Sequence, residues 1–576
     1  MSPRKAPGDD GITTAFYQAA LYMPADTQEG VPPTPFARAL LRVCGQVFAS
    51  ATIPRAWLCA SIVSIDKKDG DPLNPGDKRG IALINVGLKL VCKVLQMRIE
   101  RFVETNNLLS YEQAGFRKRE ECVGQVVSLV DIIQRRQNAG INTHVLFIRY
   151  PKGIRYSPSW CTVMEAADHG IPSSYSCISQ GIVHILICSS SGRITVIRTH
   201  SQYREVSDRM SIVGTTVKSV HQRHSRRCCT HTVPGLPRDT NPIRGLMYAD
   251  DVAVFADSEQ SLLAASTAIE QWAIQWEMQF GVTKCGIISF TGHLAPRLDN
   301  PLDIRLHGQL VSRVESYKYL GVLIDSKLDH SAWLKQKRSA LEHTISALHP
   351  VLANHQLTVN YRSRIFSAVV MGKAYYGLEL VGGNKSHLAP LQTTINKGIR
   401  LFTGARLSTA IGPLLVETGI GSLLTRSLVS RVRLLERSVT KRTPINAICS
   451  GTDNDVFTLN VQGQLVRSQR WFWSRRTKQL YRNRYWLTPQ VRPKTVKQRH
   501  SFALMETLRT CGDSASLQKY VTRQLLDTSG FFKDPSFDQS RAHGTRYLML
   551  ARMDALWTAR KAIQIGILVD TPPILS

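Results

Sequence analysis

The chain has 576 residues and a mass of 64.4 kDa, which corresponds to about three or four domain-sized units. Its 73 Lys and Arg residues outnumber 43 Asp and Glu residues, so the formal net charge is +30. Hydrophobic residues make up 43% and charged residues 20%, which excludes an intrinsically disordered chain because such chains lack this apolar content. The positive excess indicates a polyanionic partner, more often nucleic acid than an anionic membrane.

The sequence carries no sign of membrane insertion or secretion. No run of about 18 apolar residues occurs, so no membrane-spanning helix is expected. The first residues, MSPRKAPGDDGI, are polar and contain Pro and Gly, unlike a signal peptide. Twelve cysteines without a Cys-x-x-Cys pair indicate scattered, reduced thiols. We therefore expect an intracellular protein, nuclear or cytoplasmic, that is not secreted and has no membrane partner.

The first part of the chain alternates helical and strand patterns. A helix is expected at Phe36–Ser50, where the apolar spacing is helical, and a strand at Ala60–Ile65. The turn-rich KKDGDPLNPGDKRG follows, and helical spacing returns over residues 81–104. Val123–Gln137 is typical of a helix, and Thr143–Ile148 is typical of a buried strand.

The pattern weakens and then recovers. Residues 198–244 have weak periodicity and many Arg and His residues, and they are too long for an ordinary structureless loop. The apolar run Leu246–Phe255 contains two Asp residues and indicates a hairpin with an acidic turn. Ser258–Trp276 is expected to be a helix with Ser258 as its N-cap, and Ile287–Phe290 and Tyr317–Ile324 are strand candidates.

The chain beyond Asp325 is expected to be mostly helical to about residue 440. The segment SGTDND at 450–455 indicates a boundary, because it is rich in turn-forming residues. The remainder of the sequence is basic and aromatic, and no repeat of fixed period is present in the chain.

The most informative tetrapeptide is Tyr248-Ala249-Asp250-Asp251, because it puts two adjacent carboxylates into an otherwise apolar strand pair. Buried carboxylates cost free energy unless a cation neutralises them. Mg²⁺ binds through one or two carboxylates together with substrate phosphates, and two ions about 4 Å apart stabilise both oxygens of an in-line phosphoryl displacement. Asp250 and Asp251 are therefore candidate metal ligands. The alternative is an exposed Asp-Asp turn between strands.

Six segments together resemble the reverse transcriptase domain of non-LTR (LINE-type) retrotransposons, over most of residues 1–440. The order and approximate spacing of the segments carry the resemblance, because each segment alone is modest. The six segments are KAPGDDGI (5–12), VSIDKKDGDPLNPGDKRGIALINVGLKL (63–90), SYEQAGFRKRE (110–120), MYADDVAVFAD (247–257), FGVTKCGIISF (280–290) and YKYLGVLID (317–325).

The resemblance implies roles at the matching positions. Asp250 and Asp251 would bind Mg²⁺ in a two-metal site, and Lys284 would lie near the leaving pyrophosphate. Residues that would contact the incoming triphosphate, the nucleotide or the template are Lys67, Lys68, Arg79, Gln113, Gly115, Phe116 and Arg117. The primer grip would be formed by Tyr319, Leu320 and Gly321. Arg and Lys side chains also neutralise charge on a transferring phosphoryl group, although these lysines equally fit a solvated loop.

The resemblance fails at the third carboxylate that polymerases of this family need. The family strand carries an Asp, then three residues, then Ala-aromatic-Asp. Here Arg149 stands at the first Asp position, Arg155 stands at the second, and Ile154 replaces the aromatic residue. An Arg cannot be deprotonated to become a ligand. It would also repel each metal ion by several kcal/mol at an effective dielectric constant of about 20 and a separation of about 4 Å. We therefore predict that this chain polymerises nucleotides poorly.

The family's nucleotide-pocket motif, Arg-Gln-Gly-x-x-x-Ser-Pro, is also missing from residues 198–244. Local frameshifts or mis-splicing would account for both losses. Reading the codons of 149–157 one nucleotide later permits Asp-Ile-Gln-Lys-Ala-Tyr-Asp-Thr, which is the missing aspartate motif. The same shift over 207–214 permits Gln-Ile-Gly-Cys-Pro-Leu-Ser. An Arg149 codon that does not end in GA would exclude the first repair.

A basic, aromatic segment follows the helical region. Residues 467–499 contain eleven Lys and Arg residues and no Asp or Glu. Cations that follow phosphates and rings that stack on bases are typical of single-stranded nucleic-acid binding. The alternative is an amphipathic helix that buries its rings and solvates its arginines. The candidate nucleic-acid-binding residues are Trp471, Trp473, Arg475, Arg476, Arg482 and Arg484.

The expected fold is α+β, in the form of a right-hand polymerase. Fingers and palm are expected over 1–325, a helical thumb over 326–445, and a basic, aromatic-rich and mostly helical extension over 446–576. The expected activity is RNA-directed DNA polymerisation, a nucleotidyl transfer that uses an RNA template, a DNA primer, dNTPs and Mg²⁺, impaired by Arg149. The alternative is a non-catalytic nucleic-acid-binding remnant of such an element. We also expect the chain to be a fragment of a longer polyprotein, since related elements often add an endonuclease and a zinc motif.

Overall fold

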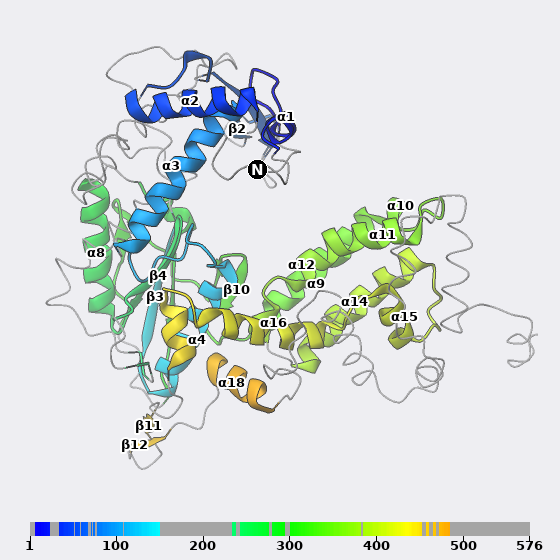
Figure 1. Cartoon of the computed structure of the whole chain (residues 1–576). Helices are drawn as coiled ribbons and strands as arrows, with labels where there is room; N and C mark the ends of the chain where they lie inside the picture. Colours follow the sequence, from blue (N-terminus) through cyan, green and yellow to red (C-terminus); the bar gives the residue numbers. More distant parts are fainter. Residues whose placement is uncertain are drawn as a thin grey trace, which may run out of the picture.

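The computed structural model describes residues 6–22, 34–50, 52–57, 59–66, 71, 73–74, 78–106, 109–149, 233–234, 236–237, 242–275, 279–293, 300–381, 384–451, 457–459, 465–467 and 472–483. These residues form an α+β structure, as the sequence predicts, with helices and small antiparallel sheets. Figure 1 shows an N-terminal part above a central sheet, and a group of helices that extends to one side of the sheet.

The N-terminal part joins a short β-hairpin to a long helix. The predicted helix at 36–50 and the predicted strand at 60–65 are confirmed as α2 and β1. Residues 81–84 are not helical as predicted, because they pair with β1 as the end of β2. Asn85 then begins α3 by accepting a hydrogen bond from the amide of Gly87. The elements are α1 (Thr14–Ala20), α2 (Pro35–Ser50), η1 (Arg55–Trp57), β1 (Ala60–Asp66), β2 (Lys78–Ile84) and α3 (Val86–Thr105).

The centre of the molecule is a four-stranded antiparallel sheet in the order β4-β5-β3-β6. Side chains alternate along β3, so Val145 and Phe147 join the core that contains α4, while Leu146 and Ile148 join the core beneath α8. Ser258 caps α8 as predicted, because its hydroxyl accepts from the amide of Ser261 at 3.2 Å. The elements are α4 (Cys122–Asn138), β3 (Thr143–Arg149), β4 (Gly245–Tyr248), β5 (Asp251–Ala256), α8 (Glu259–Gln275), η4 (Val282–Lys284) and β6 (Gly286–Phe290).

Two small hairpins follow the sheet. The first joins β7 (Arg305–Leu306) to β8 (Gln309–Leu310). The second corrects a prediction: the segment 317–324 is not one strand but two, β9 (Ser316–Tyr319) and β10 (Val322–Asp325). Leu320 and Gly321 form the two-residue turn between them, with φ of 45° and 82°, the left-handed conformation typical of tight hairpin turns.

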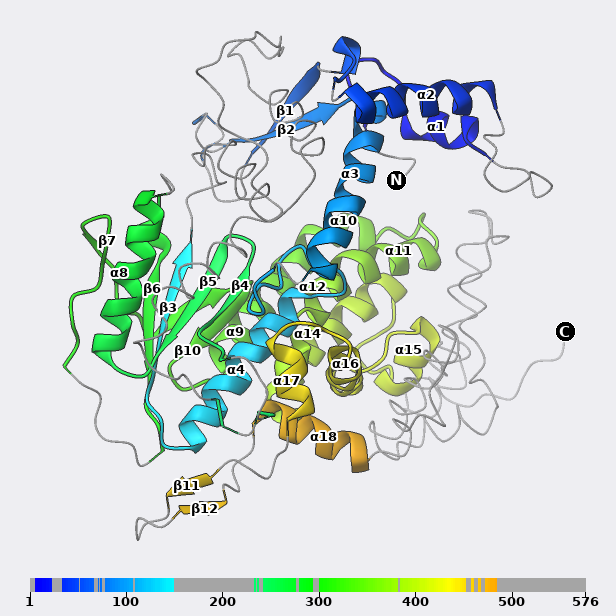
Figure 2. The same ribbon diagram turned by 60° about the vertical axis from the view of Figure 1, so that its left-hand side comes forward.

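The chain is then mostly helical, as predicted to about residue 440. Figures 1 and 2 show these helices packed together at the side of the central sheet. Buried apolar residues of the helices continue the core that contains α4. The elements are α9 (Ser331–Ala347), α10 (His349–Leu352), α11 (Val359–Phe366), η5 (Ser367–Met371), α12 (Gly372–Tyr375), α13 (Leu378–Val381), α14 (Lys385–Thr403), α15 (Ile411–Thr418), α16 (Leu423–Ser438) and α17 (Pro444–Ser450).

The last described elements are β11 (Phe457–Leu459), β12 (Leu465–Arg467) and α18 (Trp473–Asn483). Helix α18 packs against α16 and also against α4, which lies far from α18 in the sequence (Figure 2). Among the helices of the described ranges, none is long and apolar enough to cross a membrane. The cysteines in the same ranges are free thiols: Cys44, Cys59, Cys92, Cys122, Cys285 and Cys449.

Candidate active site

The acidic tetrapeptide forms the predicted hairpin. Tyr248, the last residue of β4, pairs with Asp251, the first residue of β5, and Ala249 and Asp250 form the turn. Ala249 has a φ of 57°, an uncommon conformation for a residue with a Cβ. A Cβ at Gly115 would lie 2.2 Å from the Ala249 backbone nitrogen, so only glycine allows this close approach. The turn is thus a sterically defined site that presents two half-buried carboxylates.

Arg149 lies directly beside this acidic pair. It is the last residue of β3 and pairs across the sheet with Asp251, with 3.4 Å between its Nε and the Asp251 Oδ1. Burial raises the pKa of Asp251, the positive charge of Arg149 opposes that rise, and the charge of Asp250 adds to it. The guanidinium group therefore supplies the cation for Asp251 at the position where the resembling family carries a carboxylate.

Lys284 lies in a short loop on the same end of the sheet. The amide of Gly281 donates to the carbonyl of Arg149 at 2.9 Å, so the loop is held against the end of β3. The hydroxyl of Tyr317 donates to the carbonyl of Lys284 at 2.7 Å. The Lys284 side chain is exposed, and its role near the leaving pyrophosphate stays a prediction.

Residues 110–117 cover the edge of the acidic hairpin. Gln113 forms a parallel bridge with Met247, and the amide of Ala114 donates to the Met247 carbonyl at 2.9 Å. The guanidinium of Arg117 binds both carboxylate oxygens of Glu104 at 3.0 and 2.9 Å. Gln113 is buried, and the Arg117 side chain is only 7% exposed. These internal contacts favour structural roles for both side chains instead of the predicted contact with nucleotide or template.

Phe116 differs from its neighbours. Its φ is 64° and its side chain is 53% exposed. A left-handed backbone costs free energy for a residue with a Cβ. Phe116 is the exposed residue within 110–117, and its contact with nucleotide or template stays a prediction.

The predicted primer-grip residues form the turn between β9 and β10. Tyr319 is buried, at 1% exposure, and its ring lies 5.5 Å from that of Phe147 on β3. The hydroxyl of Tyr376 donates to the carbonyl of Leu320, and a Cβ at Gly321 would meet the Tyr376 ring at 3.3 Å. The turn is therefore fixed between the central sheet and the helical region, and its backbone, not the Tyr319 ring, is exposed to a ligand.

Lys337 of α9 supports Tyr376 from behind. Its Nζ donates to the carbonyl of Tyr376 at 2.6 Å and lies 4.8 Å from the centre of the Trp333 ring. Burial lowers the pKa of Lys337 from 10.5 to about 8, and the charge of Glu379 partly opposes this shift. A half-buried ammonium group thus contacts the backbone of Tyr376, whose hydroxyl binds the turn at Leu320 and Gly321.

The stability of the protein is expected to depend on this ammonium group. Between about pH 8 and pH 10.5 the unfolded chain keeps a proton that the folded chain has lost, so the free energy of unfolding contributed by Lys337 rises with pH. We expect denaturant unfolding to show the wild type gaining about 1–3 kcal/mol relative to Lys337→Met between pH 7 and pH 10. The exposed Lys335→Met on the same helix is the control. A pH-independent difference between wild type and Lys337→Met would contradict the assignment.

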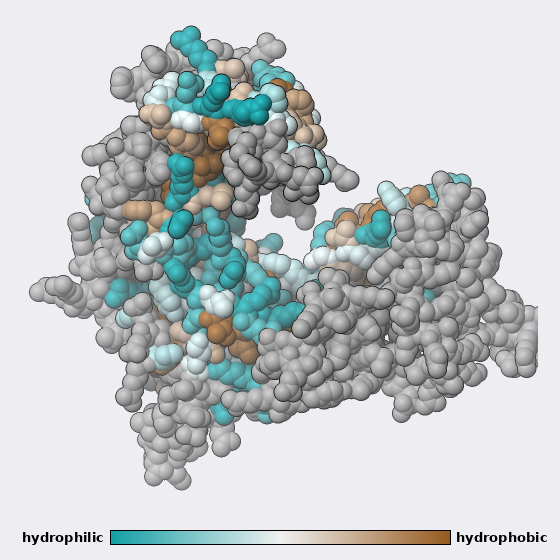
Figure 3. All heavy atoms as spheres, in the orientation of Figure 1, coloured by the Kyte–Doolittle hydropathy of each residue, from teal (hydrophilic) through white to brown (hydrophobic). Residues whose placement is uncertain are grey.

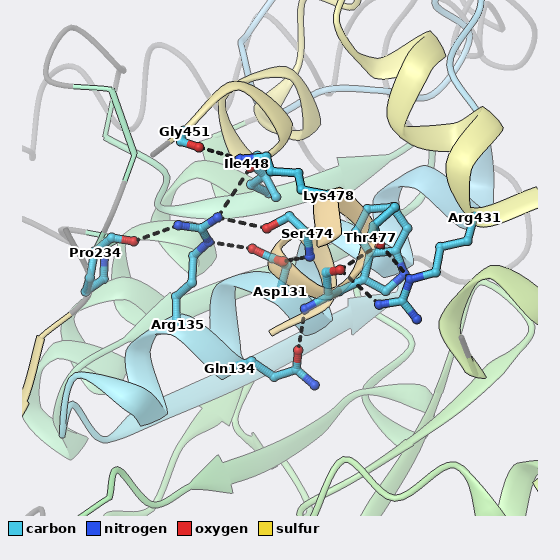
Figure 4. A network of polar contacts seen from close by, with 11 residues as sticks. Asp131, Gln134, Arg135, Pro234, Arg431, Ile448, Gly451, Ser474, Thr477 and Lys478 are labelled. Atoms are coloured by element: carbon cyan, nitrogen blue, oxygen red, sulfur yellow. Dashed lines mark hydrogen bonds and ion pairs between the residues drawn. The ribbon is translucent and has the colours of Figure 1, made fainter. Parts of the chain in front are cut away.

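The basic segment is partly an internal structural element. Figure 4 shows buried polar contacts that connect α18 to α4 and α16, while Arg135 of α4 also donates to the carbonyl of Ile448 in α17. Phe472 and Trp473 are buried, at 0% and 2% exposure, and the Trp473 indole donates to the carbonyl of Glu379 at 2.8 Å. Their rings contact the guanidinium groups of Arg135 and Arg431. This corrects the prediction that Trp473 stacks on bases, because a packed core position leaves no face for a base.

Other predicted binding residues have mixed outcomes. Arg476 is exposed on α18 and Arg475 is half-buried, so both stay candidates for phosphate contact. The backbones of Arg79 and Arg482 lie in β2 and α18. Several predicted residues or segments lie outside the described residues: Lys67, Lys68, Ile154, Arg155, residues 198–232, Trp471 and Arg484.

Three buried side chains that the sequence did not single out connect the central part of the molecule to distant segments: Gln125, Asp131 and Arg135. All three lie on α4 and are buried. The sequence does contain a signal for them, because polar side chains occur in a helix whose other residues are mostly apolar. Buried polar groups nearly always have hydrogen-bond partners, so such residues indicate partners elsewhere in the chain. The partners themselves are distant in sequence, so the pattern alone does not identify them.

The acidic pair does not make a complete two-metal site. Within the described ranges, no group of three or more His, Cys, Asp or Glu side chains is placed to hold a metal ion. Asp250 and Asp251 offer carboxylate oxygens of the kind Mg²⁺ prefers, but Arg149 brings a positive charge instead of a third carboxylate. Among the residues that the structure describes, the side chains near the acidic turn therefore do not fit the full metal complement.

An antiparallel sheet with an acidic turn at one end and helices beside it is compatible with a polymerase-like protein. The chain is 23% identical over 418 residues to the RNA-directed DNA polymerase from mobile element jockey of Drosophila melanogaster, and 23% identical over 432 residues to the protein of that name from Drosophila funebris. It is 21% identical over 419 residues to the probable RNA-directed DNA polymerase from transposon BS of Drosophila melanogaster. No protein-family model matches the chain.

These matches confirm the resemblance to the reverse transcriptase domain of non-LTR (LINE-type) retrotransposons. They cover 69–70% of this chain but only 42–43% of the relatives. The chain thus spans less than half the length of the curated relatives it matches.

Proposed function

We propose that the chain is an RNA-directed DNA polymerase domain whose catalytic centre is impaired. The observation that supports this proposal is that four segments far apart in the sequence lie at one end of the central sheet. The acidic turn at Asp250 is covered by residues 110–117, and the turn at Leu320 and Gly321 packs beside the same sheet. The lysine loop at 281–284 closes the same end.

We assign the parts of a right hand accordingly. The fingers and palm would lie in 1–325, the thumb in 326–445 and the extension in 446–576, with α18 packed against the palm helix α4. Figure 3 shows a hollow between the N-terminal part and the helical part, with hydrophilic residues on its described floor. A template–primer duplex of RNA and DNA would occupy this hollow, inside the cell, and the positive charge of the chain favours such a ligand.

The impairment follows from Arg149. Asp250 and Asp251 would still bind a divalent cation, Mg²⁺ in the resembling family. The guanidinium beside Asp251 competes with that cation and supplies no ligand. Lys284, Arg79 and the turn at 319–321 would keep their proposed roles at the phosphates and the primer.

The test is primer extension on an RNA template with dNTPs and Mg²⁺. We expect the wild type to extend slowly and Asp250→Ala to show no extension above background, because the remaining cation ligand would be a single carboxylate already paired with Arg149. Tyr317→Phe, which removes a hydroxyl from the same region but no charge, is the control. It is expected to retain the wild-type rate within about fivefold, since a net hydrogen bond contributes about 1 kcal/mol. Extension that survives Asp250→Ala would place the activity elsewhere.

A second candidate function is nucleic-acid binding without catalysis. The ion pair between Arg149 and Asp251 favours it, because Asp251 is then already neutralised. RNA binding measured between 50 and 200 mM salt would weaken steeply if several phosphates are contacted, since each contributes about 0.7–0.9 to the slope of log affinity against log salt. Binding of this kind, unaffected by Asp250→Ala and without any extension, would support this alternative.

A further inference from the structure

The candidate site includes a side chain that has no assigned role. Gln125, in the first turns of α4, is 2% exposed. Its Nε2 donates to two carbonyls, that of Glu112 at 3.0 Å and that of Met247 at 3.1 Å. A Gln side-chain amide has two N–H donors, and here both are used on backbone atoms of two segments that are distant in sequence.

These two carbonyls belong to a small closed set of hydrogen bonds. The amide of Met247 donates to Glu112 at 3.0 Å, and the amide of Ala114 donates to Met247 at 2.9 Å. The carbonyls of Glu112 and Met247 therefore each accept two hydrogen bonds, one from the backbone and one from Gln125. Gln125 thus holds together the two segments that form the single parallel bridge between residues 113 and 247.

The clamped strand is the one that leads into the acidic turn. β4 is an edge strand of the four-stranded sheet, so its outer side has no neighbouring strand to define its position. Met247 is followed by Tyr248 and then by Ala249, which Gly115 contacts closely. The position of the Asp250 carboxylate thus depends on how β4 is held at residue 247.

The helix that carries Gln125 is itself held at its other end. Asp131 and Arg135 connect α4 to α18, and Gln134 accepts a hydrogen bond from the amide of Trp473 at 3.0 Å (Figure 4). A buried helix fixed along its length is a rigid support, which is what precise positioning of functional groups requires.

We propose that Gln125 is a positioning residue that sets the acidic turn, by clamping β4 to residues 112–114. This inference rests on the proposed function only for its catalytic consequence. Its structural consequence is that Gln125 fixes the backbone of residues 112–114 relative to residues 245–250. This consequence does not depend on which activity the turn has.

The first measurement is hydrogen–deuterium exchange of the Gln125→Met variant, which keeps the side-chain length and loses both donors. We expect the amides of Ala114 and Met247 to exchange about 10- to 100-fold faster, as in local opening, while β6 and α8 exchange as in the wild type. Gln134→Glu is the matched control on the same helix, because a carboxylate still accepts from Trp473. If Gln125→Met does not fold, Gln125→Asn tests the same point, since its shorter amide cannot reach both carbonyls.

The second measurement uses the Arg149→Asp background, in which extension is expected to be measurable. Gln125→Met should lower kcat by about tenfold or more and leave KM for the primer–template within about twofold, because misplacement by about 1 Å affects the reaction more than binding. Unchanged exchange at 114 and 247, or faster exchange throughout the sheet, overturns the inference. Absence of extension in the Arg149→Asp parent would contradict the proposed function, while the exchange result would still decide the role of Gln125.

Discussion

Arg149→Asp is expected to increase both the divalent-cation affinity of the site and its primer-extension rate. The substitution removes a guanidinium that lies 3.4 Å from Asp251 and adds the carboxylate that the resembling polymerases carry. Two unit charges about 4 Å apart interact by about 4 kcal/mol at an effective dielectric constant of about 20. Removing that repulsion corresponds to about 100- to 1000-fold in rate if it acts at the transition state.

Two readouts separate the parts of this prediction. Mn²⁺ binding, followed by its electron paramagnetic resonance signal, reports the carboxylates alone, and primer extension reports the rest of the site. Arg149→Ala removes the positive charge without adding a ligand, so it should fall between wild type and Arg149→Asp in both measurements. An Mn²⁺ affinity that is equal in all three proteins would show that Asp250 and Asp251 are not a cation site.

The stability of the same variant should depend more strongly on metal than the stability of the wild type. Without metal, Asp251 loses the positive charge that opposes the rise of its pKa, and it gains another carboxylate as a neighbour. The free energy of unfolding of Arg149→Asp should therefore be lower than that of the wild type in a chelator. Added Mg²⁺ should raise its Tm more than the wild-type Tm, because a ligand that binds only the folded state stabilises it. A calorimetric comparison with and without Mg²⁺ measures both effects.

The elements that local pattern determines could be predicted from the sequence. The helices at Pro35–Ser50 and Cys122–Asn138 and the strand at Thr143–Arg149 follow from apolar periodicity. The acidic hairpin was predictable because two Asp residues interrupt an apolar run. The departure at Arg149 could also be recognised from the sequence, because the family motif has an Asp at that position.

Other features depend on contacts that a pattern does not contain. The turn at Leu320 and Gly321 was missed because leucine is an unusual residue for a φ of 45°, and Tyr376, 56 residues later, holds its carbonyl. Residues 81–84 have helical spacing but form a strand because β1 is available as a partner. The burial of Trp473 results from the packing of α18 against α4 and α16, which the basic composition of the segment does not indicate.

The second large effect is expected when the buried contact between α4 and α18 is broken. Asp131 accepts from the Nε of Arg135 at 2.6 Å and from the amide of Ser474 at 2.6 Å, and both charged side chains are fully buried. Arg135 also donates to the carbonyls of Pro234 and Ile448. Asp131→Ala leaves a buried guanidinium without its counter-charge, which costs about 3–5 kcal/mol. Denaturant unfolding of the full chain measures this loss.

A double variant separates the contribution of the two charges to stability from the contribution of the side-chain packing. Asp131→Leu with Arg135→Met removes both charges and replaces them by apolar side chains of comparable size, so it should recover much of the stability lost in Asp131→Ala, because neither charge remains unpaired. Arg476→Met, on the exposed side of α18, is the control and should change the free energy of unfolding by less than about 0.5 kcal/mol. If Asp131→Ala were as mild as Arg476→Met, α18 would not be held by this pair, and the support that α4 gives to Gln125 and the acidic turn would have to come from the apolar core alone.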